Sequence, residues 1–402
     1  MSGHRMNLMT LQEAMDLLEV SRSTLDRWRK SKRLPFIKIG KEIYFHKEDL
    51  QHWIRRQTTV LAADEAERKP LSSSPETITI GYQSGTAYMW SPLIIKELRL
   101  FEEELALIEP SRVFSVQWRN AVSGLELVED MIAGRVHVAY LGDYPIVVSQ
   151  QLSRLLPNFN PVLLAFDGKS QRGQGISIVV PRGSNIHEPE ELAGLSISTV
   201  MNSSAGCRVN RLLAALGGQP SQVIHQDMSS ILTSIRGMSK GASAMWEPYI
   251  SLAKFQGVGE VIFDEGLGAD YLTGIVAQEQ WSQRNESCVI AYLKAHLRAH
   301  QIVRDNPMKA VSIISQAAGF PQSIVAEIIA RVRWDAAVYT RDLETLLHLN
   351  DSAAAGGGNA AGSSLHPIAF RGNYLHTASR QLMLPYLTGD PLTGEWAPEQ
   401  MY

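Results

Sequence analysis

Strand-like and helix-like segments alternate along the middle of this 402-residue chain, and that alternation constrains its fold more than any other feature. Three apolar runs, 77–81, 113–118 and 136–142, have the length and residue types of buried strands. Residues 124–133, between the second and third runs, have helical spacing. Strands that alternate with helices at this interval form βαβ units with a parallel sheet. The sequence therefore predicts an α/β fold.

A change in this pattern predicts a second lobe. Around residues 157–180 two strand-like runs, 161–166 and 175–181, follow each other without a long helix between them. The alternation then resumes with a short helix and a strand over 188–198 and a longer helix over 207–216. We interpret the interruption as a crossover between two α/β lobes.

The composition is that of a globular protein, with 45% hydrophobic and 20% charged residues. No window approaches about 18 uninterrupted apolar residues, so a membrane span is not expected. The first ten residues lack the basic-then-apolar layout of a secretion signal, and Cys207 and Cys288 have no metal-binding spacing. These features favour a cytoplasmic protein with no metal and no cofactor.

The stretch 240–249, Lys-Gly-Ala-Ser-Ala-Met-Trp-Glu-Pro-Tyr, carries an apolar strand into a proline. Pro248 cannot donate to a β-ladder, so the strand should end by Glu247 and place Trp246 and Tyr249 at its carboxyl end. Small ligands bind at this end of open α/β sheets. The two aromatic residues either fill the core or form a cleft wall, and their place after a second set of βα units favours the wall.

Residues 1–57 form a separate basic module, with 12 Lys and Arg against 7 Asp and Glu. The rest of the chain holds 26 Lys and Arg against 34 Asp and Glu. This asymmetry of charge is typical of a nucleic-acid-binding module joined to an acidic domain. Thr10 and Glu13 fit a capping box at the start of a first helix. A turn and a second short helix over 24–31 complete a helix-turn-helix layout.

A lysine-tipped hairpin is predicted after the two helices. Residues 36–45 alternate around Gly40 and Lys41, and a closing helix is expected over 46–56. This order resembles the excisionase and MerR-like winged helix-turn-helix family. The resemblance implies binding to double-stranded DNA through Arg22, Ser23, Thr24, Arg27, Trp28, Lys38 and Lys41. The alternative is a small helical domain that binds protein, with its basic residues merely solvated.

Three further boundaries follow from composition. Residues 58–76 contain two prolines and a serine run, which predicts a linker before a two-lobed domain over 77–350. A Gly/Ala/Ser-rich linker is predicted over 351–364. The extension over 365–402 holds aromatic residues without a clear period, so docking on the body of the chain and docking on a second protomer both remain open.

A serine-rich start precedes the helix over 207–216. Asn202, Ser203 and Ser204 supply hydroxyls and free N–H groups, which favour an anion together with the helix dipole. The alternative is an ordinary serine N-cap.

Five short motifs occur in order in the large domain, and each is common on its own. They are Ile80–Gly85, Gly134–Gly142 with its Gly-Asp-Tyr-Pro end, Val180–Ser184 with Glu191–Gly194, the helix start at Asn202, and Trp246–Tyr249. Over about residues 77–345 they resemble the type II periplasmic-binding-protein fold, in the branch of the nitrate, sulfonate, taurine and thiamine-precursor importers. The resemblance implies two lobes that close on a small ligand.

By this resemblance, both lobes would line the cleft, through Ser84, Gly85, Trp90, Trp118, Asp143, Tyr144, Asn202, Ser203, Ser204, Trp246 and Glu247. The chain departs from the family at Ser243, where members often have an aspartate. Importer components also begin with a secretion signal, whereas this chain begins with the basic module.

No Ser-His-Asp or paired-carboxylate spacing stands out, so an enzyme is not expected. The pattern favours a one-component transcription regulator that binds DNA as a homodimer. It would sense a small anionic or zwitterionic molecule, like a sulfonate, nitrate or a thiamine precursor. The alternative is a solute-binding component of an ABC importer that carries an accessory domain.

Overall fold

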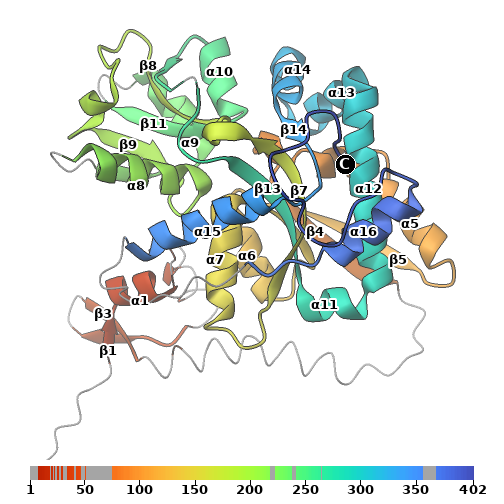
Figure 1. Cartoon of the computed structure of the whole chain (residues 1–402). Coiled ribbons are helices and arrows are strands. Elements are labelled where there is room, and N and C mark those ends of the chain that lie inside the picture. The colour runs from red at the N-terminus through yellow and green to blue at the C-terminus, as the bar shows by residue number, and fades with distance from the viewer. Residues whose placement is uncertain are drawn as a thin grey trace, which may run out of the picture.

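The computed structural model describes residues 8–18, 20, 22, 25–26, 29, 34–39, 42–46, 50, 75–217, 222–237, 241–263, 265–355 and 368–402. Within these residues the chain forms a small N-terminal unit and a larger two-lobed α/β domain (Figure 1). None of the helices in this described part is both long enough and apolar enough to cross a membrane.

The described part of the N-terminal unit contains a three-stranded antiparallel sheet in the order β1-β3-β2, and helix α1 contacts β1 and β3. The elements are β1 (Leu8–Thr10), α1 (Leu11–Leu18), β2 (Ile37–Ile39) and β3 (Glu42–His46). The predicted hairpin is confirmed by the pairing of Ile39 with Glu42, whereas β1 is a strand that the sequence did not reveal. Most of the predicted second helix and closing helix lies outside the described residues.

The capping box that starts α1 is confirmed. The Thr10 N–H donates to Glu13 Oε2 at 2.7 Å, and the Glu13 N–H donates to Thr10 Oγ1 at 3.2 Å. These reciprocal bonds satisfy donors that the first turn of a helix leaves free. The helix then buries Ala14 in a small core of its own, with Leu25, Leu34, Phe45 and Leu50.

The first lobe is built on a six-stranded sheet in the order β14-β7-β13-β6-β4-β5. Strands β4, β5 and β6 are parallel, and β13, β7 and β14 continue the sheet in antiparallel pairs. The strands are β4 (Glu76–Tyr82), β5 (Phe114–Asn120), β6 (Val138–Gly142), β7 (Pro161–Ser170), β13 (Tyr271–Gln278) and β14 (Arg333–Trp334).

Helices cover both faces of this sheet. Its N-terminal helices are η1 (Ala87–Met89), α4 (Ser91–Glu97), α5 (Leu100–Ile108), α6 (Gly124–Ile132) and α7 (Asp143–Ser153). The later part of the chain returns with α11 (Glu279–Arg284), α12 (Glu286–Asp305), α13 (Pro307–Ala318), α14 (Gln322–Arg331) and α15 (Thr340–Ala355). The sequence also predicts helices over 286–304, 306–315 and 321–330, and α12, α13 and α14 confirm them.

The second lobe has a five-stranded sheet in the order β10-β9-β11-β8-β12. Its strands are β8 (Ile176–Pro181), β9 (Ser196–Thr199), β10 (Gln222–His225), β11 (Ala242–Trp246) and β12 (Gly259–Val261). The helical elements are η3 (Pro189–Leu192), α8 (Ser204–Leu216), α9 (Met228–Ser234), η4 (Ile235–Gly237) and α10 (Tyr249–Phe255). Strand β11 ends directly before Glu247, as Pro248 predicts.

Two crossing segments join the lobes. The chain leaves the first lobe after β7, passes through η2 (Gln171–Gly173) into β8, and returns between β12 and β13. Gly173 has φ of 69°, and a Cβ atom there would lie 2.3 Å from the Leu267 carbonyl oxygen. Glycine is required at this point because the two crossing segments touch through their backbones.

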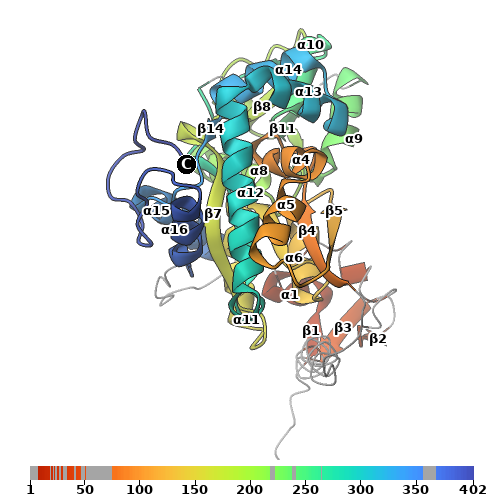
Figure 2. The ribbon, with the colours of Figure 1, turned by 90° about the vertical axis from the view of Figure 1, so that its right-hand side faces the viewer.

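The C-terminal extension docks on the body of the chain, which decides the alternative left open above. Helix α16 (Gly372–Gln381) packs against α12 and β7, and the Leu163 N–H donates to the Ala369 carbonyl (Figure 2). Tyr402 is buried, and its carbonyl accepts a hydrogen bond from the Ala336 N–H. Helix α15 runs to Ala355, five residues into the tract predicted as a linker.

Candidate ligand-binding cleft

The carboxyl ends of strands from both lobes surround a cavity of about 210 Å³. The first lobe contributes the segments after β4 and β5, and the second lobe contributes the end of β11 and the start of α9. The loop between α13 and α14 closes one side. The lining residues are Gln83, Ser84, Gly85, Thr86, Asn120, Ala121, Val122, Asp227, Met228, Ser229, Trp246, Tyr249, Ala318 and Phe320.

Aromatic side chains form one wall of this cavity. The Trp246 indole N–H donates to the Gly85 carbonyl at 2.9 Å, so the indole is fixed across the two lobes. The Tyr249 and Phe320 rings pack edge to face with their centroids 6.0 Å apart. Flat apolar faces held in this way offer a ligand contact area at little cost in side-chain entropy.

Hydroxyl and amide groups supply the polar part of the lining. Asn120 accepts a bond from the Ser84 N–H at 3.0 Å and donates one to Ser84 Oγ at 2.8 Å, which ties the ends of β4 and β5 together. Ser229 Oγ lies 3.3 Å from the Tyr249 hydroxyl. Among the lining residues that the structure describes, Asp227 carries the one charged side chain, and its bonds to Ser230 lower its pKa.

A pocket of about 20 Å³ adjoins the cavity and shares Gln83, Thr86 and Trp246 with it. Ser203 and Ser204, at the start of α8, form part of its wall. The Ser203 hydroxyl accepts a bond from the Gly206 N–H at 3.1 Å, so it caps the helix as the ordinary N-cap interpretation expects. The pocket has room for about one water-sized group beside the helix start.

A buried ion pair joins the lobes beneath this pocket. Arg208 on α8 donates to Asp143 Oδ2 on α7 at 2.7 Å, and both side chains are almost fully buried. The same guanidinium nitrogen donates to the carbonyls of Ala269 and Asp270 in the returning crossing segment. A Cβ atom on Gly142 would lie 2.7 Å from Ser204 Oγ, so the lobes are in direct contact here.

The structure places the predicted ligand-binding residues in two groups. Those that line the cavity or the adjoining pocket are Ser84, Gly85, Ser203, Ser204 and Trp246. Those outside both linings are Trp90, Trp118, Asp143, Tyr144, Asn202 and Glu247.

The contacts of three of these residues explain why they lie outside the linings. Trp90 is buried, and its indole N–H donates to the Ser84 carbonyl, so it supports the loop from behind. Strand β5 extends to Asn120, two residues beyond its predicted end, so Trp118 packs on Tyr82 within the sheet. Asp143 is fully engaged with Arg208.

The lining residues that were missed from the sequence include Asn120, Asp227, Ser229 and Phe320. Asn120 is the last residue of β5 and Asp227 comes two residues after β10, so correct strand ends would have found both. Phe320 comes from a loop between two helices, where no pattern in the sequence indicates a binding site.

One buried cluster of potential metal ligands lies elsewhere in the described residues, between β7 and α12. It consists of Asp167, His296 and His300. His300 Nε2 lies 2.8 Å from Asp167 Oδ1, and His296 lies within hydrogen-bond distance of the Tyr140 hydroxyl and the Phe166 carbonyl. Every imidazole nitrogen thus has a hydrogen-bond partner, which favours a structural network over a metal site.

Comparisons with known proteins agree with this architecture. A family model described as a helix-turn-helix domain matches residues 8–58, and one described as NMT1/THI5 like matches residues 172–310. A putative aliphatic sulfonates-binding protein of Escherichia coli is 22% identical over 266 residues, which cover 64% of this chain and 76% of that protein. The taurine-binding periplasmic protein of the same organism is 24% identical over 227 residues, which cover 54% of this chain and 68% of that protein.

Solved structures show the same fold. The alkanesulfonate-binding protein of Xanthomonas axonopodis pv. citri, bound to MOPS, superposes with a TM-score of 0.58 at 18% identity and covers 71% of this chain and 94% of its own. The periplasmic nitrate-binding protein of Synechocystis superposes with a TM-score of 0.59 at 14% identity. The match covers 78% of this chain and 90% of that protein.

The large domain therefore has a periplasmic-binding-protein-like fold of the kind found in sulfonate- and nitrate-binding proteins. The chain as a whole joins this solute-binding-like domain to an N-terminal domain of the helix-turn-helix family. Both resemblances stated from the sequence are confirmed.

Proposed function

We propose that this protein is a one-component, ligand-responsive transcription regulator. The observation that carries the proposal is the presence, in one chain, of a helix-turn-helix family domain and a two-lobed domain with a cavity between its lobes. A DNA-binding role would place the cleft in the cytoplasm. The lobes would bind a ligand without chemical conversion, so the protein would not be an enzyme.

The proposed ligand is a small anionic or zwitterionic molecule. Hydroxyl, amide and main-chain N–H groups around the cavity could hold a sulfonate-like head, and the described lining contains no Lys or Arg. An anion there would be bound by dipoles, including that of α8, and the aromatic wall would contact its apolar part. Of the residues expected from the sequence, Ser84, Gly85, Ser203, Ser204 and Trp246 have the position this role requires.

The proposed DNA contacts come from the N-terminal unit. Arg22 and Lys38 are exposed, as contacts to phosphate require. Ser23, Thr24, Arg27, Trp28 and Lys41 lie outside the described residues, and their roles stay predictions. Helix-turn-helix proteins commonly bind spaced half-sites as dimers, so a homodimer is proposed.

Ligand-dependent regulation requires that the ligand discriminates between open and closed lobes. A ligand with equal affinity for both forms would shift neither population, however tightly it bound. Closure would then change the spacing of two DNA-binding units in a dimer.

The decisive experiment measures binding of the full chain to the DNA upstream of its own gene. Titrations at several salt concentrations would be run with and without a ligand found by thermal shift among sulfonates, nitrate and pyrimidines. We expect salt-sensitive binding whose affinity changes with ligand. DNA affinity that is the same with and without a bound ligand would contradict the regulator.

The alternative is a solute-binding component of an importer with an accessory domain. It is favoured by the relatives, which are named as sulfonate- and taurine-binding proteins. Ligand binding without any salt-sensitive DNA binding would support this alternative.

A further inference from the structure

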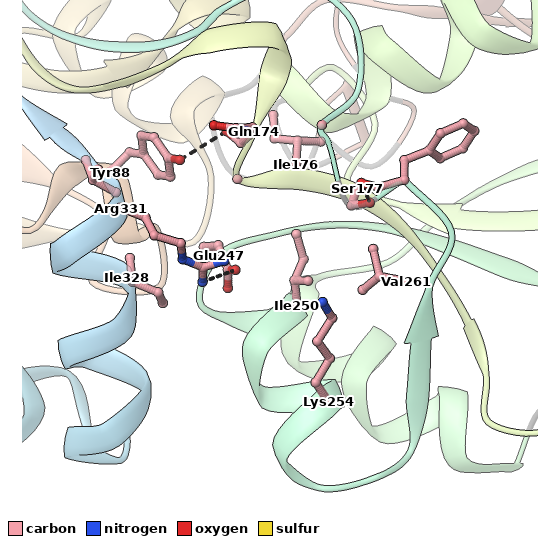
Figure 3. Close-up of a pocket in the computed structure, with 14 residues that line it drawn as sticks. Tyr88, Gln174, Ile176, Ser177, Glu247, Ile250, Lys254, Val261, Ile328 and Arg331 are labelled. Carbon is pink, nitrogen blue, oxygen red and sulfur yellow. Dashed lines mark hydrogen bonds and ion pairs between the residues drawn. The ribbon is translucent and has the colours of Figure 1, made fainter.

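A second cavity, of about 330 Å³, lies on the other side of the turn that joins β11 to α10 (Figure 3). Trp246 and Tyr249 face the ligand cavity described above, whereas Glu247 and Ile250 line this second cavity. Its walls come from α10 and β8 of the second lobe and from α14 of the first lobe. Among the residues that the structure describes, none lines both cavities.

Polar groups of the second cavity are arranged around Glu247. Its carboxylate accepts bonds from the N–H and hydroxyl of Ser251 at 3.0 and 2.9 Å, and from Arg331 Nη2 at 3.2 Å. Within the described part of the chain, Nη2 makes all of the polar contacts of Arg331, including an ion pair with Glu327 at 3.3 Å. Nη1 and Nε take no part in these contacts with described residues, and 54% of this side chain is exposed.

A second cation and an apolar surface complete the cavity. Lys254 extends from α10 beside Ile250, on the opposite lobe from Arg331 (Figure 3). Ile176, Val261, Ile328 and Val332 supply apolar wall. Both carboxylate oxygens of Glu247 already accept hydrogen bonds from Ser251.

We propose that this cavity is a second ligand site, for a small organic anion with an apolar body. The forked guanidinium of Arg331 would bind a carboxylate or sulfonate through two N–H groups, and Lys254 would add a point charge from the other lobe. The aliphatic side chains would cover the apolar body. The site is independent of the proposed regulator function, since it needs neither the cleft ligand nor DNA.

An anion here would bridge the lobes and act on the cleft. The Glu247 carbonyl accepts a bond from the Ala87 N–H, and the Glu247 N–H donates to the Gly175 carbonyl, both at 2.9 Å. One turn thus carries a wall residue of each cavity and is bonded to the first lobe and to the crossing segment. Occupation of either cavity would change the affinity of the other by the same factor.

The test uses calorimetry of the full chain with hexanoate and hexanesulfonate, and with hexanamide as the uncharged control. Arg331→Met should weaken binding of both anions about tenfold or more, Arg331→Lys should weaken it less, and Lys254→Met should weaken it several-fold. Glu327→Gln removes the competitor for Arg331 and should tighten anion binding about two- to fivefold. Binding of hexanamide should be weak in every variant.

Two results would overturn the site. One is equal anion affinity in the parent chain, Arg331→Met and Lys254→Met, with thermal unfolding showing that the variants are folded. The other is loss of anion binding in Ser84→Ala alone, which would place the anion in the cleft. Ser84 lines the cleft and not the second cavity. The Ser84→Ala measurement therefore separates failure of the second site from failure of the proposed regulator.

Discussion

At the scale of single residues, proton positions in the buried network follow from hydrogen-bond chemistry. A carbonyl can only accept, so His296 Nε2, 2.9 Å from the Phe166 oxygen, carries the ring proton. His296 Nδ1 then accepts from the Tyr140 hydroxyl at 3.0 Å. One neutral tautomer satisfies both partners, whereas a second proton, on Nδ1, would require the Tyr140 hydroxyl to accept instead of donate. Burial, with a contribution from nearby His300, lowers the pKa of His296 to about 3.

His296→Gln tests this assignment through the protons taken up on unfolding. The folded pKa is below the ordinary value of 6.5, so the unfolded state binds more protons between about pH 3 and 6.5. The stabilisation is complete above pH 6.5 and is lost as the pH falls toward 3. At pH 5 calorimetry should find about one proton fewer taken up by the variant than by the parent chain. Equal uptake would mean that His296 is already charged in the folded protein.

Residue roles were the part of the site that sequence predicted least well. Trp246 and Ser84 were correctly predicted to line the cavity, because residues at the carboxyl ends of strands lie at the same edge of the sheet. Trp118 was expected to line the cleft because it is the last residue of the predicted strand 113–118. Strand β5 runs on to Asn120, and apolar alternation does not mark where a strand ends. The Asp143 pairing with Arg208 joins residues 65 positions apart, and no local pattern encodes such a contact.

At the scale of elements, patterns over several residues predicted the structure well. The capping box, the hairpin register around residues 39–42 and the long helix from Glu286 were all found from spacing and turn residues. Strands β1, β10, β12 and β14 were missed, and each is only 2 to 4 residues long. The eight-residue strand β13 was missed as well. Short strands are stabilised by their partners in the sheet, so their own sequences carry little signal.

Thr10→Ala should destabilise the N-terminal unit by about 1 kcal/mol. The substitution removes the hydroxyl that accepts from the Glu13 N–H, so a donor in the first turn of α1 loses its partner. Thr10→Ser keeps that oxygen and is the matched control. Chemical unfolding monitored in this unit should show a lower midpoint for the alanine variant only, and equal midpoints for both variants would contradict a capping role.

At the scale of the whole molecule, the lobes of the described domain contact each other at the turn after β11 and at the ion pair of Arg208 and Asp143, among other places. The turn after β11 contacts the first lobe through Trp246 and Glu247. The ion pair of Arg208 and Asp143 lies between the start of α7 and the first turns of α8. The sequence predicted two lobes and their order, but a closed arrangement depends on side-chain contacts between distant segments.

Removing Arg208 should shift this domain toward an open form. Arg208→Gln leaves the Asp143 carboxylate without its partner in a buried position, which costs about 3–5 kcal/mol unless the lobes separate and water reaches it. The hinge carbonyls of Ala269 and Asp270 also lose a donor. Small-angle scattering should therefore show a larger radius of gyration for Arg208→Gln than for the parent chain, and the free energy of unfolding should fall.

The double variant Asp143→Asn/Arg208→Gln supplies the matched control. It removes both charges, so no unpaired buried ion remains, and much of the stability lost in each single variant should return. The sum of the two single effects should exceed the double effect by a coupling energy of about 1–3 kcal/mol. Additive effects, together with unchanged scattering in all three variants, would show that the ion pair does not hold the lobes closed. Closure would then depend on the Trp246 turn, where both cavities meet.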